Sequence, residues 1–249
     1  MLLEQTLEKL QRMKLGAMAE GVREQTRQPE ALALSFEERL GLLVDREWEA
    51  RENRVITRRL QGAHLRQPAT IENLEFGAER GLDRGRILSL AACHFIEQGH
   101  HVLITGPTGA GKSYLACALG QRACRLRYSV RYFRCGPLLT ELALARADGS
   151  YPSWIRKVQK APLIILDDWG LVPLNQEGAR EIFELLEERP GSVIVASQIP
   201  VAQWYDVIAA PTLADAILDR LVHNAYKIEL RGESMRKRLS PLVSPAPAP

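Results

Sequence analysis

The sequence predicts an α/β protein built on a five-stranded parallel sheet and preceded by a small all-helical N-terminal domain. From residue 67 onward, apolar runs of strand length alternate with helical stretches, which is typical of strand–helix–strand units. A glycine-rich motif stands between the first of these runs and a helical stretch. Before residue 67, apolar residues recur at helical spacing instead.

The N-terminal domain is expected over residues 1–66. Its first helix is indicated by leucines at helical spacing, Leu3, Leu7 and Leu10. Gln28-Pro29 breaks the pattern, and Ser35 with Glu38 forms an S-x-x-E capping box that predicts a new helix running to about Leu60. That helix carries an apolar stripe formed by Phe36, Leu40, Leu43, Val44 and Trp48.

The α/β domain is expected over residues 67–239, because Gln67-Pro68 disfavours helix at the boundary. Its strands are predicted at His101–Thr105, Val130–Cys135, Leu163–Asp167, Ser192–Ser197 and Tyr226–Leu230. The proline-rich tail, residues 240–249, has the composition of a disordered segment.

The glycine-rich motif matches G-x-x-x-x-G-K-[ST] at every fixed position: Gly106-Pro107-Thr108-Gly109-Ala110-Gly111-Lys112-Ser113. A strand leads into it, and a helix from Tyr114 to about Arg127 leads out. Glycines let backbone N–H groups turn toward phosphates, and the helix N-terminus adds positive charge. We expect this loop and Tyr114 to bind a nucleoside triphosphate, with Lys112 on the β and γ phosphates and Ser113 on Mg²⁺.

Two carboxylates, Asp167 and Asp168, end the third predicted strand. Adjacent carboxylates repel unless a cation lies beside them, and a magnesium–nucleotide complex supplies one. We expect Asp167 to hold the metal and Asp168 to orient or deprotonate the attacking water, which makes the reaction hydrolysis. The alternative is a purely structural role, in which Asp168 caps the next turn.

Small-molecule kinases and GTPases share the phosphate loop, so the downstream residues must separate the classes. Ser197-Gln198 follows the fourth strand, Asp219-Arg220-Leu221 precedes the last, and Gly232-Glu233-Ser234-Met235-Arg236 follows it. This order resembles that of AAA+ ATPases. The resemblance implies that Gln198 senses the γ-phosphate, that Arg220 is an arginine finger for the neighbouring subunit, and that Arg236 is a second sensor. The chain is too short beyond Arg236 for the full helical lid of that class.

Two further regions carry a more specific resemblance. One is N-terminal: Ser35-Phe36-Glu37-Glu38-Arg39-Leu40 and Glu47-Trp48-Glu49-Ala50-Arg51-Glu52-Asn53-Arg54. The other comprises Ser197-Gln198-Ile199-Pro200, Gln203-Trp204, Asp206, the run 211–225, Ile228-Glu229-Leu230 and Gly232-Glu233-Ser234. Together they resemble the IstB family, the ATP-binding helper proteins of bacterial insertion sequences, related to the helicase loader DnaC.

The resemblance implies ATP as the nucleotide, self-assembly with ATP sites shared between subunits, mostly non-specific binding to double-stranded DNA, and delivery of that target to a cognate transposase. A DnaC-like helicase loader is the alternative, because the two share the ATPase core. A small-molecule kinase is a third reading, and it would give Arg220 no role.

Basic clusters give independent but moderate support for DNA. They are Arg51, Arg54, Arg58 and Arg59; Arg122, Arg125, Arg127, Arg131 and Arg134; and Arg156, Lys157 and Lys160. Such residues bind phosphates with little sequence preference, although each cluster could equally be a solvated surface. The net charge of +3 decides nothing. With no run of roughly 20 apolar residues, we expect no membrane association and a cytoplasmic location, which suits four cysteines without a C-x-x-C pair.

Overall fold

The computed structural model describes residues 2–187, 191–232, 234 and 235. The chain divides into two compact units, Met1–Arg58 and Arg59–Pro249. Helix α4 (Phe36–Ala63) contributes most of its length to the first unit and its last turn to the second.

The first unit is entirely helical. It consists of α1 (Leu2–Arg12), α2 (Gly16–Arg27), α3 (Pro29–Leu32) and the first part of α4. The predicted capping box is confirmed, because the Glu38 amide donates to Ser35 Oγ at 3.2 Å and the Ser35 amide donates to a Glu38 carboxylate oxygen at 2.8 Å. Helix α4 accordingly begins at Phe36.

A buried glutamate joins α2 to α4 within this unit. Glu47 is 4% exposed, and one of its oxygens accepts from the amides of Ala17 and Met18 at 2.9 and 3.1 Å. These amides belong to the first turn of α2, where a carboxylate also meets the positive end of the helix dipole. The other oxygen accepts from Arg51 and Arg54, both at 3.0 Å. Glu47 therefore acts as the cap of α2 from another helix.

The apolar stripe of α4 does not face α2. Phe36, Leu40, Val44 and Trp48 are all exposed, whereas Leu43 is half-buried. Helix α2 approaches the Leu43 side so closely that a Cβ on Gly21 would lie 2.7 Å from Leu43 Cδ2. Polar contacts, above all those of Glu47, thus select the face of α4 that packs.

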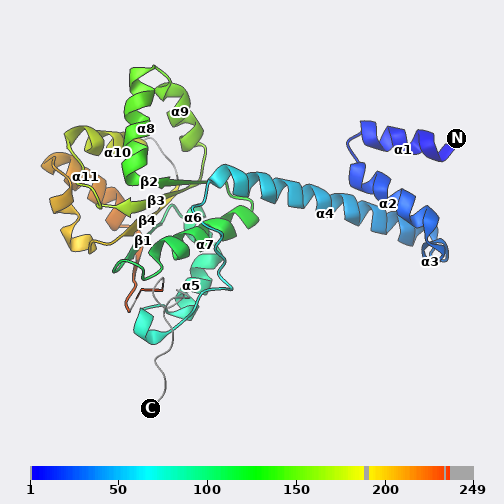
Figure 1. Cartoon of the computed structure of the whole chain (residues 1–249), viewed down its shortest axis with the longest axis horizontal. Helices are drawn as coiled ribbons and strands as arrows, with labels where there is room; N and C mark the ends of the chain where they lie inside the picture. Colours follow the sequence, from blue (N-terminus) through cyan, green and yellow to red (C-terminus); the bar gives the residue numbers. More distant parts are fainter. Residues whose placement is uncertain (1, 188–190, 233, 236–249) are drawn as a thin grey trace, which may run out of the picture. The chain divides into compact units, whose positions relative to one another are not determined.

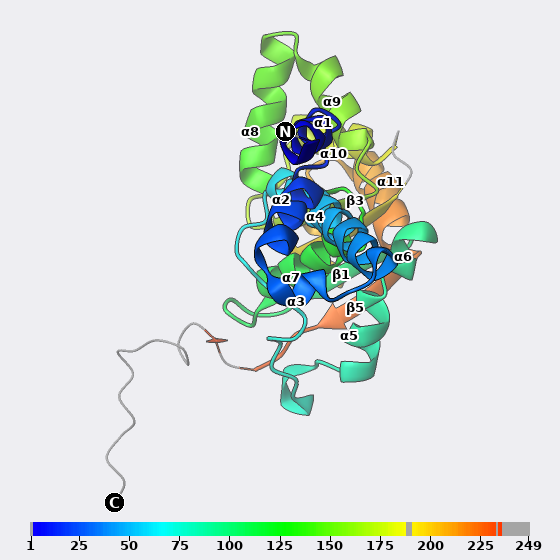
Figure 2. The same cartoon turned by 90° about the vertical axis from the view of Figure 1, so that its right-hand side faces the viewer.

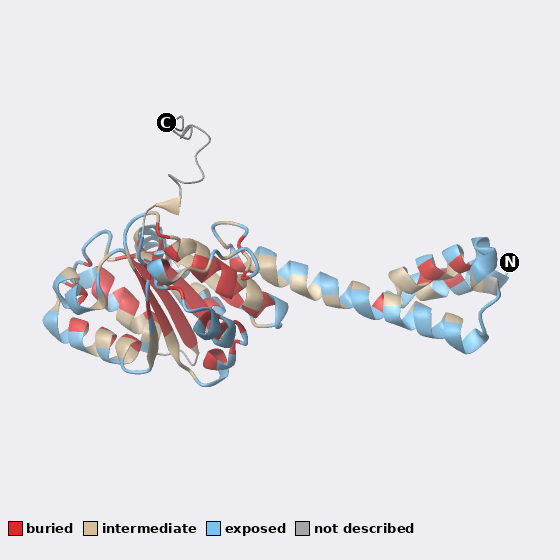
Figure 3. Cartoon of the chain, turned by 90° about the horizontal axis from the view of Figure 1, so that it is seen from below, coloured by how far each residue is buried: buried red, intermediate tan, exposed pale blue. Residues whose placement is uncertain are grey.

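The second unit is built on one parallel sheet, and the predicted five strands are confirmed. They are β1 (His101–Thr105), β2 (Val130–Arg134), β3 (Leu163–Trp169), β4 (Ser192–Ser197) and β5 (Ala225–Glu229). Their order is β2-β3-β4-β1-β5, with every neighbouring pair parallel. The strands lie in the buried interior of this unit (Figure 3). Strand β3 extends two residues beyond the predicted Asp167, with a register shift against β4 between Leu166 and Trp169.

Helices cover both faces of the sheet (Figure 1). On one face lie α5 (Arg84–Ala91), α6 (His94–Glu97) and α7 (Lys112–Arg125); on the other lie α8 (Cys135–Ala147), α9 (Tyr151–Gln159), α10 (Gln176–Glu187) and α11 (Pro211–Val222). Alternate strand residues feed the two cores, so Val102 and Ile104 of β1 join the first and Leu103 joins the second. Short 3-10 turns lie at Ala78–Arg80, Val201–Gln203 and Tyr205–Val207.

The last turn of α4 is fixed to the second unit. Ala63 is fully buried in the first core, and Arg131 of β2 donates to the Gly62 carbonyl at 2.8 Å. His64, with a φ of 53°, takes the left-handed conformation that ends helices. The helix therefore stops at Ala63, slightly beyond the end predicted near Leu60.

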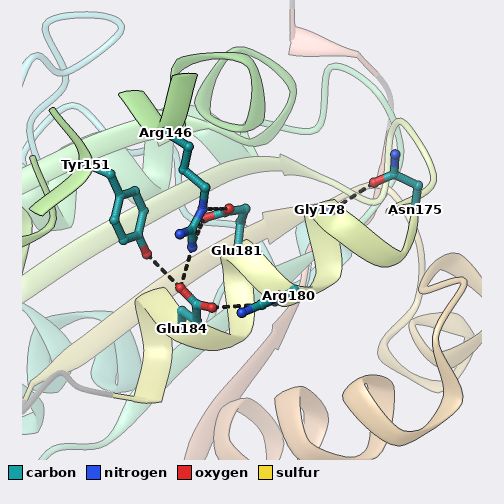
Figure 4. A network of polar contacts seen from close by, with 7 residues as sticks. All are labelled: Arg146, Tyr151, Asn175, Gly178, Arg180, Glu181 and Glu184. Carbon is teal, nitrogen blue, oxygen red and sulfur yellow. Dashed lines mark hydrogen bonds and ion pairs between the residues drawn. The ribbon is translucent and has the colours of Figure 1, made fainter. Parts of the chain in front are cut away.

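Helices α8 and α9 form a hairpin beside α10 (Figure 2). Arg146 at the end of α8 forms ion pairs with Glu181 and Glu184 of α10, and its guanidinium lies 3.9 Å from the centre of the Tyr151 ring (Figure 4). The Tyr151 hydroxyl donates to Glu184 at 3.0 Å. This network ties the hairpin to α10. Among the described residues, no helix combines the length and apolarity that crossing a membrane requires.

Candidate functional site

The candidate site lies at the carboxyl ends of the strands, where α/β proteins place ligands. The loop after β1 carries three glycines with positive φ, Gly106 (144°), Gly109 (82°) and Gly111 (97°). A Cβ on Gly106 would lie 2.3 Å from the Leu230 carbonyl oxygen, and one on Gly109 would lie 2.1 Å from Ser234 Oγ. Only glycine fits these positions, so the backbone can present its N–H groups without side chains in the way.

The loop positions its own lysine and a glutamine that follows β4. Lys112, the first residue of α7, is 8% exposed, and its Nζ donates to the Pro107 carbonyl at 2.9 Å. Thr108 donates through its hydroxyl to Gln198 Oε1 at 2.7 Å. Gln198, which follows β4, is therefore brought onto the loop.

The structure brings Ser113 and Asp167 together as the sequence predicts. Ser113 Oγ donates to Asp167 Oδ1 at 3.0 Å, and the Asp168 amide donates to the same oxygen at 2.9 Å. The buried Tyr132 donates to Asp167 Oδ2 at 2.5 Å. Burial, followed by this hydrogen bond to a carboxylate, raises the pKa of Tyr132 far above its usual value, so the hydroxyl stays a donor. A hydroxyl and a carboxylate held side by side form a donor set that suits Mg²⁺.

Asp168 is held in a different way from its neighbour. Its φ of 57° lies in the left-handed region, which Asp tolerates better than most residues. Arg134, at the end of β2, donates to Asp168 Oδ2 at 2.8 Å, and this hydrogen bond raises the pKa of the guanidinium. Arg66 Nη1 lies 3.7 Å from Asp168 Oδ2 and 3.6 Å from Asp167 Oδ2. Two arginines thus face two aspartates.

These groups line one cavity of about 660 Å³. Its cationic and polar side includes Lys112, Ser113, Arg66, Arg134, Asp168 and Gln198. The same lining also includes Asn73, Leu74, Leu82 and Tyr114. Such a cavity fits a nucleotide, with the triphosphate on the cationic side and the base among less polar groups. Residues 73–75 line this cavity, whereas Ile87 is buried in the core.

A buried arginine links two segments of the chain that line this cavity. Arg80 is 9% exposed and donates to the carbonyls of Glu75 and Ala110, both at 3.0 Å. The segment after β5 also reaches the loop, because the Met235 amide donates to the Gly109 carbonyl at 3.0 Å. Arg236 itself lies outside the described residues.

Arg220 lies apart from this cavity. It belongs to α11, where it pairs with Glu187 at 3.2 Å and lies 4.6 Å from the centre of the Phe183 ring. It is not among the residues that line the cavity. The site of a single chain therefore assembles around Lys112, Ser113, Asp167, Asp168 and Gln198, without Arg220.

The sequence placed Arg134 in a basic cluster and did not single out Arg66, Tyr132 or Arg80. Strand pairing could have identified Arg134, since it is opposite Asp167 in the register of β2 and β3, and carboxyl ends of parallel strands meet. Arg131 also turns inward, to the end of α4. No sequence signal identifies Arg66 or Arg80, because their contacts depend on tertiary folding.

Sequence comparisons place the chain among proteins of insertion sequences. The family described as IstB-like ATP binding protein matches residues 8–242. An insertion sequence ATP-binding protein of Sinorhizobium fredii, y4pL, is 47% identical over 95% of this chain and 98% of its own length. The ATP-binding protein of insertion sequence IS21 from Pseudomonas aeruginosa is 33% identical over 94% of this chain and 88% of its own.

Structural comparisons support the fold. DnaA from Aquifex aeolicus, bound to the ATP analogue AMPPCP, superimposes with a TM-score of 0.58 at 18% identity, covering 70% of this chain and 53% of DnaA. DnaI gives a TM-score of 0.57 at 19% identity, covering 67% and 95%. At these identities the likeness concerns the fold, which is that of AAA+ P-loop proteins.

Proposed function

The chain belongs to the IstB-like ATP-binding protein family and is an AAA+-type ATPase, and we propose that it is a transposition helper that assembles on target DNA with ATP and delivers that DNA to its partner transposase. The observation that carries this proposal is that Lys112, Ser113, Asp168 and Gln198 line one cavity, whereas Arg220 stands outside it. Each part of the proposal rests on separate contacts.

ATP is bound through the loop from Gly106 to Ser113 together with Tyr114. Lys112 neutralises the phosphates, and Ser113 and Asp167 hold Mg²⁺, since they already lie 3.0 Å apart. The metal supplies positive charge that stabilises the phosphates during hydrolysis. Asp168 lines the same cavity and orients the attacking water. Gln198, which accepts a hydrogen bond from Thr108 of the loop, contacts the γ-phosphate.

The ATP site is completed by a neighbouring subunit. Arg220 projects from α11, and its Nη1 atom is buried without a hydrogen-bond partner among the described residues. A buried guanidinium nitrogen with an unused donor is costly. Insertion of Arg220 into the next subunit's ATP site would satisfy it and stabilise the charge of phosphoryl transfer. Arg236 is proposed as the second sensor in the same site.

Double-stranded DNA is bound mainly through phosphates. Arg156 and Lys157 of α9 and Lys160 just after it are all exposed, whereas Ile155 and Val158 face the core. The ion-pair network around Arg146 fixes this helix to α10 and so holds its basic face in place (Figure 4). A solved DnaA complex with single-stranded DNA shows that a protein of this fold can carry nucleic acid. Phosphate contacts of this kind give little sequence preference.

The transposase is the proposed partner because relatives named for insertion sequences match nearly the whole chain, including the helical unit. The alternative, a replicative helicase loader, rests on the shared fold alone. A cytoplasmic location follows from either function. The helical unit is where the two differ, since it would contact a transposase or DNA in one case and a helicase in the other.

The test is DNA affinity with and without nucleotide. We expect binding to a fluorescent duplex of arbitrary sequence to tighten at least about tenfold when a non-hydrolysable ATP analogue and Mg²⁺ are added. Arg156→Glu should weaken that binding about tenfold, because a phosphate contact becomes a repulsion. Arg86→Glu reverses an exposed arginine at the start of α5 and serves as the matched control. Equal affinity with and without the analogue would contradict the proposal.

A further inference from the structure

Arg66 is the only cationic partner of Asp167 among the ion pairs of the described residues. Asp167 is 1% exposed, so its charge is removed from water and needs compensation. Ser113, Tyr132 and the Asp168 amide give it hydrogen bonds but no positive charge. Arg66 supplies that charge from 3.6 Å.

Arg66 and Arg134 are held with different strength. Arg134 donates a direct hydrogen bond to Asp168 at 2.8 Å. Arg66 lies 3.6 and 3.7 Å from the two carboxylates, beyond hydrogen-bond distance, and 35% of its side chain is exposed in the cavity. Arg66 is therefore the more easily displaced of the two guanidinium groups.

The backbone around Arg66 is tied to both helix α4 and the phosphate loop. Two residues before it, His64 ends α4, and Gly62 accepts a hydrogen bond from Arg131. Leu65 packs on α7, since a Cβ on Gly120 would lie 3.1 Å from Leu65 Cδ2. Burial raises the pKa of the Cys117 thiol of α7, and the amides of Gln67 and Arg66 act against that rise, so they face the sulfur. A movement of Arg66 therefore shifts the backbone segment that follows α4.

We propose that Arg66 is a positioning residue that neutralises Asp167 in the absence of Mg²⁺ and nucleotide and turns to the phosphates when Mg²⁺ and ATP bind. This inference rests on the proposed magnesium–ATP site. Arg66 gives up Asp167 because a divalent cation on that carboxylate repels the guanidinium, and the triphosphate in the same cavity attracts it. The segment 64–71 thereby reports the nucleotide state to the end of α4.

The experiment titrates a fluorescent ATP analogue against the full chain at a series of Mg²⁺ concentrations. In Arg66→Ala, the metal has lost its competitor for Asp167, so the Mg²⁺ concentration for half-maximal binding should fall at least about threefold. The affinity measured without metal should fall about tenfold, because a cation facing the phosphates is gone. Arg66→Lys keeps the charge and should lie between wild type and Arg66→Ala. Arg125→Ala, an exposed arginine at the end of α7, is the control for lost charge.

Hydrogen exchange of segment 64–71 is the second measurement. If Arg66 had only a structural role, its substitution would not change how this exchange responds to nucleotide and Mg²⁺. In the wild type, a non-hydrolysable ATP analogue should change exchange there more with Mg²⁺ than without it, and Arg66→Ala should lose that difference. If wild type binds nucleotide with the expected metal dependence but Arg66→Ala and Arg66→Lys match it in both measurements, the inference is overturned and the ATP site stands. If wild type binds no nucleotide, the site and the inference both fail.

Discussion

Two regions of this molecule place carboxylates against arginines, one within the packed helical unit and one beside a cavity. In the helical unit, Glu47 is surrounded by two arginines and two helix amides, which leaves its oxygens fully used. At the sheet edge, Asp167 and Asp168 also face two arginines, but Asp168 and both arginines line a cavity. The first cluster is closed and the second is open to a ligand.

The difference teaches which ion pairs are structural and which can be exchanged. Glu47 and Asp167 are both buried carboxylates that accept hydrogen bonds and face arginines. Neither burial nor ion pairing therefore marks a functional site by itself. What distinguishes the sheet edge is the adjoining cavity with Lys112 and the loop amides on its wall. Changes at the sheet edge should therefore alter chemistry at little cost in stability, and changes at Glu47 should do the reverse.

Asp168→Asn should have the largest effect on turnover. Loss of the group that orients water should lower ATP turnover about 10²- to 10⁴-fold while nucleotide affinity stays near that of wild type. Asn also tolerates the left-handed backbone at this position, where φ is 57°, so folding should be preserved. Steady-state hydrolysis and analogue binding measure the two effects. Normal turnover in this variant would remove the catalytic role from Asp168; Asp206→Asn, at an exposed position, is the control.

Lys112→Ala should act on binding. The phosphates lose a nearly buried cation, so nucleotide affinity should fall about 100-fold, and turnover at subsaturating ATP should fall with it. Titration with a fluorescent ATP analogue checks this, with Lys160→Ala as the matched change on an exposed lysine. An affinity equal to that of wild type would mean that the cavity is not the phosphate site.

The fold of the second unit could be predicted closely from sequence, because its strands are continuous apolar runs that both faces bury. The strands at His101–Thr105 and Ser192–Ser197 match the prediction to the residue. The sequence could predict that Ser113 and Asp167 lie together, because the phosphate-loop motif and the acidic end of the third strand both indicate a metal ligand. The partners of Asp168 could not be predicted in this way, since Arg66 reaches it from a segment about 100 residues earlier.

The helical unit was harder to read. Its apolar stripe has the spacing of a packing face, yet four of its residues are exposed. A glutamate decides the packing instead, through amides of another helix, and such a contact leaves no periodic signal in the sequence. Periodicity thus located helix α4 without revealing which of its faces contacts α2.

Glu47→Ala should destabilise the helical unit and leave ATP turnover unchanged in the absence of DNA. Loss of the cap on α2 should cost about 1–2 kcal/mol, and hydrogen exchange of the amides of Ala17 and Met18 should report it. Glu49→Ala removes an exposed carboxylate from the same helix and is the control. Lost turnover with unchanged protection of α2 would contradict the division between the two clusters.

The same residue gives a pH dependence. Burial raises the pKa of Glu47, but hydrogen bonds from Arg51 and the amides of Met18 and Ala17 outweigh it and hold the pKa below the ordinary 4.5. A lowered folded pKa means that the stabilisation is present above pH 4.5 and is lost as the pH falls through the folded value. The protection difference between wild type and Glu47→Gln should therefore shrink in that range. A difference that grows on acidification would contradict this assignment.

The central claim is that an open site at the sheet edge is completed by Arg220 of a neighbouring subunit. The most direct test mixes two inactive variants, Lys112→Ala and Arg220→Ala, in the presence of DNA. Random assembly pairs an intact loop with an intact Arg220 at up to about a quarter of the interfaces, so ATP hydrolysis should return to about that fraction of the wild-type rate. A mixture that stays as inactive as its two components would contradict a site shared between subunits.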